Sequence, residues 1–229
     1  MRHSRNSPGV AKAAKPTFPV RDTMTLPHLH GLYAITDGPR ADLLDVVAQA
    51  LAGGTRLLQY RDKTSDTARR RTEAFALKQL CAEHNVPLII NDDIALALDI
   101  RADGVHLGED DGGIAEARSA LGKQAIIGVS CYGSLEYAYA GVAAGADYVA
   151  FGAFFPSPTK PHARQASIEL LRQSAALGVP RVAIGGITPD NGAPLIKAGA
   201  DYLAVISAVF ASTDVRAAAQ RFANLYSSD

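Results

Sequence analysis

The stretch Leu88-Ile89-Ile90-Asn91-Asp92 decides how the rest of the chain is interpreted. Three aliphatic residues run directly into an amide and a carboxylate, and no polar residue alternates with them. An uninterrupted apolar run is typical of a strand buried on both faces, as strands of a parallel sheet are. Asn91 and Asp92 would then lie at the carboxyl end of that strand, where α/β proteins bind their ligands.

Seven further runs share the character of this strand. The predicted strands are Gly31–Thr36, Arg56–Tyr60, Pro87–Asn91, Gly104–Leu107, Ala125–Val129, Tyr148–Gly152, Arg181–Gly185 and Tyr202–Ile206. The segments between them have apolar residues at helical spacing, so strands and helices alternate and imply right-handed crossovers in a parallel sheet. Such units predict an α/β fold of the TIM (β/α)8 barrel type. An open doubly wound sheet is the alternative, although no Gly-x-Gly-x-x-Gly or Walker-type loop supports it.

A phrase that recurs in the chain supports the same repeating unit. Ala144-Gly-Ala-Asp147 and Ala198-Gly-Ala-Asp201 are each followed by a tyrosine and an apolar run, and Arg101-Ala-Asp103 is a third version. In each we expect a helix to end, a short turn to follow and a strand to begin. The glycine is expected to cap the helix, because positive φ is easy only for glycine.

Composition bounds the class of protein. Hydrophobic residues make up 48% of the 229 residues and charged residues 20%, which suits one domain with a large core. The formal net charge is zero, so composition favours neither nucleic acid nor a membrane surface as partner. No run approaches the roughly 20 apolar residues that a membrane helix needs. Cys81 and Cys131 fit no zinc or CxxC spacing, and we therefore expect a reduced, cytoplasmic protein. The oligomeric state stays open, and a homo-oligomer is possible.

The first 28 residues differ from the rest of the chain. Residues 1–28 are rich in Arg, Lys and Pro, with few large apolar side chains and no hydrophobic signal region. We expect a flexible extension there, followed by a single barrel domain over residues 29–229. Met24 is an alternative start.

Polar side chains follow the predicted strands, and in a barrel these positions surround one shared pocket. They lie at Thr36-Asp37, Gln59 to Lys63, Asn91 to Asp93, His106 to Asp111, Ser130-Cys131, Pro156 to Lys160, Gly185 to Thr188 and Ile206-Ser207. Asp92 with one of the acids at 109–111 could hold a magnesium ion, which prefers oxygen ligands, few protein carboxylates and substrate phosphates. For Glu109 and Asp110 the alternative of a solvated loop acid is stronger than for Asp92, which directly follows a buried run.

Two further groups suit phosphate chemistry. Arg61, Lys63 and Lys160 are cationic partners for an anion such as diphosphate. Gly185-Gly186 and Ser207 follow the seventh and eighth strands, where barrels commonly bind a phosphate through backbone N–H groups. A tight turn without a ligand is the alternative for the glycines.

The remaining candidates have simpler interpretations. Cys131 lacks an obvious histidine base, so a buried, inert thiol is expected. His106, inside a strand, is expected to be a hydrogen-bonded core histidine. Tyr137 and Tyr139 are expected on a helix surface.

Taken in order, these motifs resemble those of the thiamine-phosphate synthase family from about residue 30 to 210. The motifs are Leu32-Tyr-Ala-Ile-Thr-Asp37, Gln59-x-Arg61-x-Lys63, Ile90-Asn-Asp92, Gly104-Val-His-Leu-Gly108 with Asp111, Gly128-Val-Ser130, Phe151-Gly152 through Pro158-Thr-Lys160, Gly185-Gly-Ile187 and Ile206-Ser-Ala208. The resemblance implies a magnesium-dependent alkyl transferase of thiamine biosynthesis. It would join hydroxymethylpyrimidine diphosphate to hydroxyethylthiazole phosphate, or its carboxylated form, and release thiamine phosphate and diphosphate.

The resemblance also implies roles for individual residues. The pyrimidine diphosphate would contact Gln59, Tyr60, Arg61, Asp62, Lys63, Asn91, Ser130 and Lys160, of which Arg61, Lys63, Ser130 and Lys160 would be catalytic. The thiazole phosphate would contact Ser157, Pro158, Thr159, Gly186, Ile206 and Ser207, and magnesium would be ligated by Asp92 and Asp111. The chain departs from the family pattern at Glu109, commonly Gln, and at Tyr132, often His. Glu109 leaves the choice between Asp110 and Asp111 slightly open.

Two rival functions are distinguishable from the sequence. A related thiazole tautomerase would share the fold and the phosphate site but would need no diphosphate–magnesium site, so Arg61, Lys63, Asp92 and Lys160 favour the synthase. A catalytically silent phosphate-binding barrel would be expected to lack the metal acids or the lysine, and this chain retains them.

Overall fold

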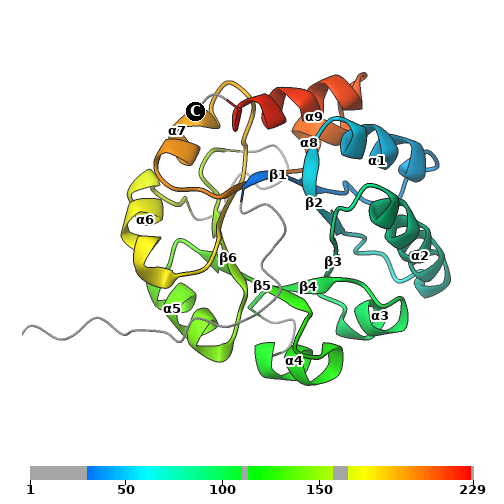
Figure 1. The fold of residues 1–229 in the computed structure, drawn as a ribbon, viewed down its shortest axis with the longest axis horizontal. Helices are drawn as coiled ribbons and strands as arrows, with labels where there is room; N and C mark the ends of the chain where they lie inside the picture. The colour runs from blue at the N-terminus through cyan, green and yellow to red at the C-terminus, as the bar shows by residue number, and fades with distance from the viewer. Residues whose placement is uncertain (1–29, 110–112, 157–164, 228–229) are drawn as a thin grey trace, which may run out of the picture.

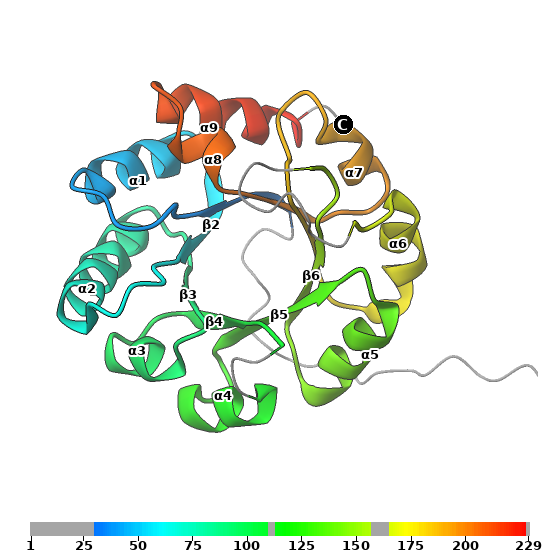
Figure 2. The ribbon, with the colours of Figure 1, turned by 180° about the vertical axis from the view of Figure 1, so that it is seen from behind.

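The computed structural model describes residues 30–109, 113–156 and 165–227. Within these residues eight parallel strands close into a barrel in the order β1 to β8, and helices surround it (Figure 1; Figure 2 shows it from behind). The strands are β1 Gly31–Ile35, β2 Thr55–Tyr60, β3 Leu88–Asn91, β4 Gly104–Leu107, β5 Ile126–Tyr132, β6 Tyr148–Gly152, β7 Arg181–Ile184 and β8 Tyr202–Val205. The predicted TIM barrel is confirmed, and the open-sheet alternative is wrong because β1 pairs with β8.

Helices connect the strands and cover the outside of the barrel (Figure 1). They are α1 Leu43–Ala52, α2 Thr67–Glu83, α3 Ile94–Asp99, α4 Ile114–Leu121, α5 Leu135–Ala144, α6 Ile168–Gln173, the 3-10 helix η1 Ser174–Leu177, α7 Ala193–Lys197, α8 Ser207–Phe210 and α9 Val215–Asn224. No described helix is both long and apolar enough to cross a membrane.

Strand alternation divides the buried residues between two cores. One core fills the barrel and includes Tyr33, Leu57, Ile89, Tyr148 and Tyr202. The other lies between the strands and the helices and takes the alternate strand residues, such as Leu58, Tyr60, Ile90, Val105 and Val149. A residue's position along its strand therefore decides whether it faces the barrel interior or the helices.

The recurring aspartates fasten the amino ends of the strands. The Asp103 backbone N–H donates to the Leu88 carbonyl at 3.0 Å, and its Oδ2 accepts from the Leu88 N–H at 2.8 Å. Asp147 holds Ile127 in the same way, with an Oδ2 distance of 2.8 Å. Asp201 does so with Arg181, at 2.7 Å.

Basic side chains contact these three aspartates as well, and we call each aspartate with its strand contact and its basic partner an aspartate latch. Lys78, Arg118 and Arg181 form ion pairs with Asp103, Asp147 and Asp201 respectively, at 2.6, 2.5 and 3.2 Å. Each latch ties the start of one strand to the strand before it. The sequence phrase that recurs along the chain is therefore a recurring piece of structure at the end of the barrel opposite the strand carboxyl ends.

The preceding helices end near these aspartates as expected, with Gly145 as the C-cap of α5 and Gly199 directly after the C-cap of α7, Ala198. Gly145 and Gly199 have φ of +105° and +106°. Arg101 stands at the equivalent position in the third version and also has positive φ, +53°. A side chain thus occupies a backbone conformation that favours glycine.

Candidate active site

Asp92 stands at the carboxyl end of β3 and contacts the end of β2. Its φ is +64°, a left-handed conformation that Asp and Asn tolerate better than most residues. The Lys63 Nζ lies 3.3 Å from Asp92 Oδ2, and the Asn91 Nδ2 donates to the same oxygen at 2.5 Å. The structure therefore brings together three of the predicted site residues.

The neighbouring acid Asp93 contacts α3 and Arg70 instead of Lys63. Its Oδ1 accepts from the Leu96 N–H at 2.8 Å and caps α3, while Oδ2 pairs with Arg70 at 2.8 Å. Two adjacent aspartates thus divide their roles, since one caps a helix and the other turns toward Lys63.

Thr36 holds the main chain of Arg61, which sequence reasoning missed. The Thr36 side chain is fully buried at the end of β1. Its Oγ1 accepts from the Arg61 N–H at 2.8 Å and donates to the Arg61 carbonyl at 3.2 Å. The signal available in the sequence was a hydroxyl residue at the end of the strand next to β2.

The substrate contacts predicted for Tyr60 and Asp62 stay predictions, and both side chains have partners within the chain. Tyr60 faces the helices, because Gln59 before it faces the barrel interior, and its hydroxyl donates to Glu73 Oε2 on α2 at 2.7 Å. Asp62 is 7% exposed, accepts from the Thr64 N–H at 2.8 Å and pairs with Arg69 at 2.7 Å. Both side chains thus brace the segments on either side of Arg61.

The charge partners of Asp62 determine its ionisation. Burial raises the pKa of this carboxyl, but the Thr64 N–H and the Arg69 charge outweigh burial, so the pKa lies below its ordinary value. Asp62 therefore stays ionised and keeps Arg69 in place.

A chain of hydrogen bonds crosses the barrel interior beneath the site. Gln59 Nε2 donates to the Tyr33 hydroxyl at 2.7 Å, and that hydroxyl lies 2.8 Å from the Tyr148 hydroxyl. Tyr148 in turn is 2.9 Å from His106 Nδ1, and His106 Nε2 is 3.0 Å from Ser130 Oγ. The prediction of a hydrogen-bonded core histidine is confirmed, and its partner is the predicted site residue Ser130.

A bulge at the end of β5 presents Ser130 to the interior. The pairing with β6 shifts between Ser130 and Tyr132, which makes β5 longer than predicted. Cys131 between them is fully buried toward the helices, and burial raises the pKa of its thiol to about 12. The prediction of a buried thiol is confirmed. Tyr132 has φ of +52°, which is unusual for a bulky residue.

Gly185 and Gly186 are required by a close approach of two loops. Their φ values are +105° and +61°, and a Cβ on Gly186 would lie 2.5 Å from the Pro156 carbonyl oxygen. Asn191 fixes the same loop, since its Nδ2 donates to the Gly186 carbonyl at 3.0 Å and its Oδ1 accepts from the Thr188 N–H at 2.8 Å. The glycines thus have a structural reason that is independent of a phosphate.

Ile206 and Ser207 lie at the junction of β8 and α8. The Ile206 carbonyl accepts from the N–H groups of Val209 and Phe210, and Ser207 begins the helix. Asp111 and the segment Ser157, Pro158, Thr159 and Lys160 lie outside the described residues, as does Asp110.

The donor set at Asp92 suits magnesium. Asp92 supplies an anionic oxygen beside a lysine that can bind phosphate, and magnesium commonly uses one or two carboxylates plus substrate phosphates. Among the described residues no group of three or more His, Cys, Asp or Glu side chains could hold a metal by itself. A site of this kind would therefore need ligands beyond Asp92.

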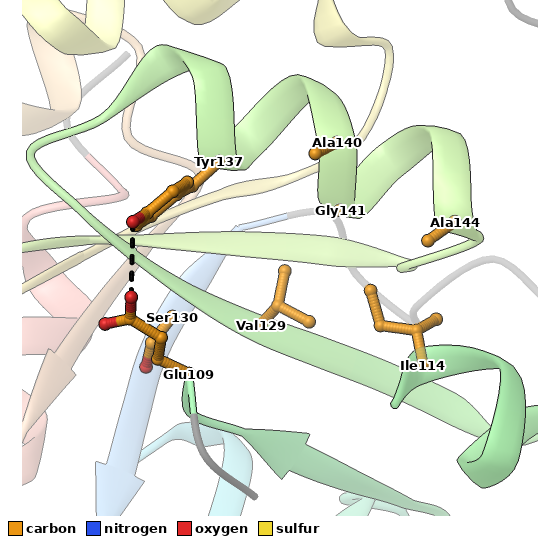
Figure 3. A pocket seen from close by; sticks show the side chains of 8 residues that line it. All are labelled: Glu109, Ile114, Val129, Ser130, Tyr137, Ala140, Gly141 and Ala144. Atoms are coloured by element: carbon orange, nitrogen blue, oxygen red, sulfur yellow. Dashed lines mark hydrogen bonds between the residues drawn. The ribbon is translucent and has the colours of Figure 1, made fainter. Parts of the chain in front are cut away.

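An apolar groove lies outside the barrel between α4 and α5 (Figure 3). Ile114, Val129 and Gly141 line it, and its volume is about 340 Å³. At its rim the Tyr137 hydroxyl donates to Glu109 Oε1 at 3.2 Å, as the dashed line shows. Tyr137 is on the helix surface as predicted, 44% exposed. Tyr139, on the same helix, is half-buried and packs against the core.

Comparison with known proteins identifies the family. Residues 32–209 match the family model described as thiamine monophosphate synthase. The thiamine-phosphate synthase of Nitrosococcus oceani is 54% identical over 198 residues, covering 85% of this chain and 91% of that protein. That of Xanthomonas campestris pv. campestris is 55% identical over 200 residues, covering 86% and 96%.

Comparison with solved structures also finds a member of this family. The thiamine phosphate pyrophosphorylase of Pyrococcus furiosus superposes with a TM-score of 0.79 at 36% identity, covering 87% of this chain and 96% of that one. A 3-hexulose-6-phosphate synthase superposes with a TM-score of 0.62 at 15% identity, which shows a shared fold alone. With a family match that spans most of the barrel and relatives above 50% identity, the chain belongs to the thiamine-phosphate synthase family of enzymes.

Proposed function

We propose that this protein condenses hydroxymethylpyrimidine diphosphate with hydroxyethylthiazole phosphate to give thiamine phosphate and diphosphate; with the carboxylated form of the thiazole phosphate, CO2 is released as well. The observation that carries the proposal is the meeting of Lys63, Asn91 and Asp92 at adjacent strand ends. Arg61 follows directly on β2 and is held by Thr36. Cationic and anionic groups side by side suit a diphosphate that binds together with a metal ion.

The chemistry asks the protein to stabilise a leaving group. The bond between the pyrimidine methylene carbon and the diphosphate oxygen breaks, the electron pair leaves with the oxygen, and the thiazole nitrogen bonds to the carbon. Arg61, Lys63 and Lys160 hold the charge that develops on the diphosphate. Asp92 and Asp111 would hold Mg²⁺, which supplies further stabilisation of the leaving anion when bound.

No protein nucleophile or strong base is needed for this reaction. The binding site has only to hold the thiazole nitrogen in line with the reacting carbon. Gln59, Asn91 and Ser130 contact the pyrimidine diphosphate, and the contacts of Tyr60 and Asp62 stay part of the proposal, although their side chains also bind Glu73 and Arg69. This accounts for a site in which the one nearby thiol, Cys131, is buried and protonated.

The thiazole phosphate binds at the carboxyl ends of β7 and β8. Gly186, Ile206 and Ser207 would contact it, together with Ser157, Pro158 and Thr159. Barrels often bind phosphate at this position through backbone N–H groups. The conformation of Gly186 leaves its backbone uncovered by a side chain on a loop that Asn191 holds in place.

The setting of the enzyme is part of the proposal. The two cysteines, Cys81 and Cys131, are unpaired and buried, which supports a reducing, cytoplasmic location. The catalytic domain spans residues 29–229, residues 1–28 are an extension, and a homo-oligomer remains a prediction.

The decisive experiment mixes both substrates with the protein, with and without EDTA, and measures thiamine phosphate. We expect product only when magnesium is present. Asp92→Asn should abolish turnover, whereas Asp99→Asn on the surface of α3 serves as the control for loss of a carboxylate. Proton exchange on the thiazole phosphate without condensation would favour a tautomerase. Phosphate binding without either reaction would indicate a silent barrel.

A further inference from the structure

The hydrogen-bond chain from Gln59 to Ser130 joins five strands through the barrel interior. Gln59 comes from β2, Tyr33 from β1, Tyr148 from β6, His106 from β4 and Ser130 from β5. The four side chains before Ser130 are 2%, 1%, 0% and 8% exposed. Water cannot replace a broken link in such an environment, so the links depend on one another.

The first link sets the direction of the chain. The Gln59 Nε2 atom is a donor only, so the Tyr33 oxygen accepts from it. The Tyr33 and Tyr148 oxygens lie 2.8 Å apart, a distance at which either can donate. Because a buried hydroxyl hydrogen without an acceptor is costly, we assign the Tyr33 hydrogen to the Tyr148 oxygen. Each hydroxyl carries a single hydrogen, so the same requirement for an acceptor assigns the direction of the next link.

The direction passes through His106 to Ser130. Since Tyr148 accepts from Tyr33, its own hydrogen is donated to His106 Nδ1 at 2.9 Å. An imidazole that accepts at Nδ1 carries its proton on Nε2, and this N–H donates to Ser130 Oγ at 3.0 Å. Ser130 accepts from His106 and keeps its own hydroxyl hydrogen for another partner.

We propose that this chain is a relay of fixed direction that holds Ser130 as a hydrogen-bond donor toward the pyrimidine substrate, with Tyr33, Tyr148 and His106 as positioning residues. The proposal rests on the proposed function only for the identity of the substrate. Its consequence is a rule for recognition: the ligand atom at Ser130 is an acceptor. The relay couples this rule to the carboxamide orientation of Gln59, because turning that amide over would reverse every link.

The relay can be tested without a substrate. Protein with ¹⁵N-labelled histidine gives the protonation of each ring nitrogen by NMR, and the His106 signals are those that disappear in His106→Asn. We expect the proton on Nε2 and an Nδ1 signal that moves downfield in Tyr148→Phe, because it loses its donor. Tyr202→Phe is the matched control, since Tyr202 packs edge-on against Tyr33 and the four hydrogen bonds of the relay join other side chains. A proton on Nδ1, or an Nδ1 signal unchanged in Tyr148→Phe, would overturn the proposal.

A double-mutant cycle tests the effect on the substrate. We expect Tyr148→Phe and Ser130→Ala each to raise the KM for the pyrimidine diphosphate by about tenfold, the worth of one net hydrogen bond. The double variant should be little worse than either single one, because both break the same relay. Tyr202→Phe and Ser130→Ala should combine independently. Independent effects of Tyr148→Phe and Ser130→Ala would refute the relay and leave the proposed reaction intact, whereas absence of thiamine phosphate from the wild type would refute the reaction and leave the NMR result standing.

Discussion

Replacing Thr36 with valine separates the placement of Arg61 from the presence of Arg61. Valine has nearly the shape of threonine, so the buried site stays filled, but both hydrogen bonds to the Arg61 main chain are lost. The guanidinium remains in the protein and only its anchor is removed. Any loss of activity then reports on how Thr36, after β1, positions Arg61, after β2.

The magnitude follows from the groups left without partners. A part-buried N–H that loses its acceptor costs about 1–3 kcal/mol. A change of 1 kcal/mol shifts the Tm of a domain of this size by about 2–4 °C, so we expect a decrease of about 2–12 °C. A displacement of Arg61 of the order of 1 Å should lower kcat/KM by about 10- to 100-fold, because alignment with the diphosphate is lost.

The assay compares Thr36→Val with Thr55→Val by thermal unfolding and steady-state kinetics. Thr55 is 2% exposed and donates to the Ala50 carbonyl at 2.8 Å, at the opposite end of the barrel. Its replacement should cost about 0.5–1.5 kcal/mol of stability and leave kcat/KM unchanged. Thr36→Ser keeps the hydroxyl and should keep most of the activity. If Thr36→Val retains wild-type kcat/KM, or loses no more of it than Thr55→Val does, Thr36 does not position Arg61.

Three further predictions follow from backbone conformation and burial. Gly186→Ala should cost at least about 1 kcal/mol more than Gly178→Ala, because both have positive φ but only the former would place a Cβ against another loop; equal unfolding free energies would contradict this. Arg101→Gly should leave the free energy of unfolding unchanged or raise it by up to about 1 kcal/mol, because glycine adopts positive φ without strain. A clear decrease in that free energy would show that the arginine side chain makes a contact that offsets its strain. Burial raises the pKa of Cys81 and of Cys131 to about 12, so neither thiol should react with iodoacetamide at pH 8 until the protein is unfolded; mass spectrometry counts the labels.

Much of the fold could be predicted because its signals are local. Apolar runs bounded by polar residues placed all eight strands, and most of the predicted ends lie within a residue of those observed. The recurring Ala-Gly-Ala-Asp phrase predicted the glycine caps. The β5 end could not be predicted, because the bulge beyond Ser130 depends on pairing with β6 rather than on the β5 sequence.

The candidate site was predictable only in part. Arg61, Lys63 and Asp92 could be grouped because carboxyl ends of parallel strands meet, and the ion pair between Lys63 and Asp92 bears this out. The alternation that turns the Gln59 side chain into the barrel turns the Tyr60 side chain toward the helices, and this difference could have been predicted from the sequence. The links that join Gln59 to Ser130 were beyond sequence reasoning, since they pair residues separated by as many as 115 positions.

The three aspartate latches stabilise the barrel at the end opposite the proposed substrate site. Asp103, Asp147 and Asp201 fasten the floor of the barrel, while the residues proposed to bind substrate stand at the opposite rim. Substitutions at the rim can therefore accumulate without loosening the floor, and a barrel held in this way could be given new rim loops for another phosphorylated substrate. A protein engineer would leave the Ala-Gly-Ala-Asp corners untouched and vary what lies beyond the carboxyl ends of the strands.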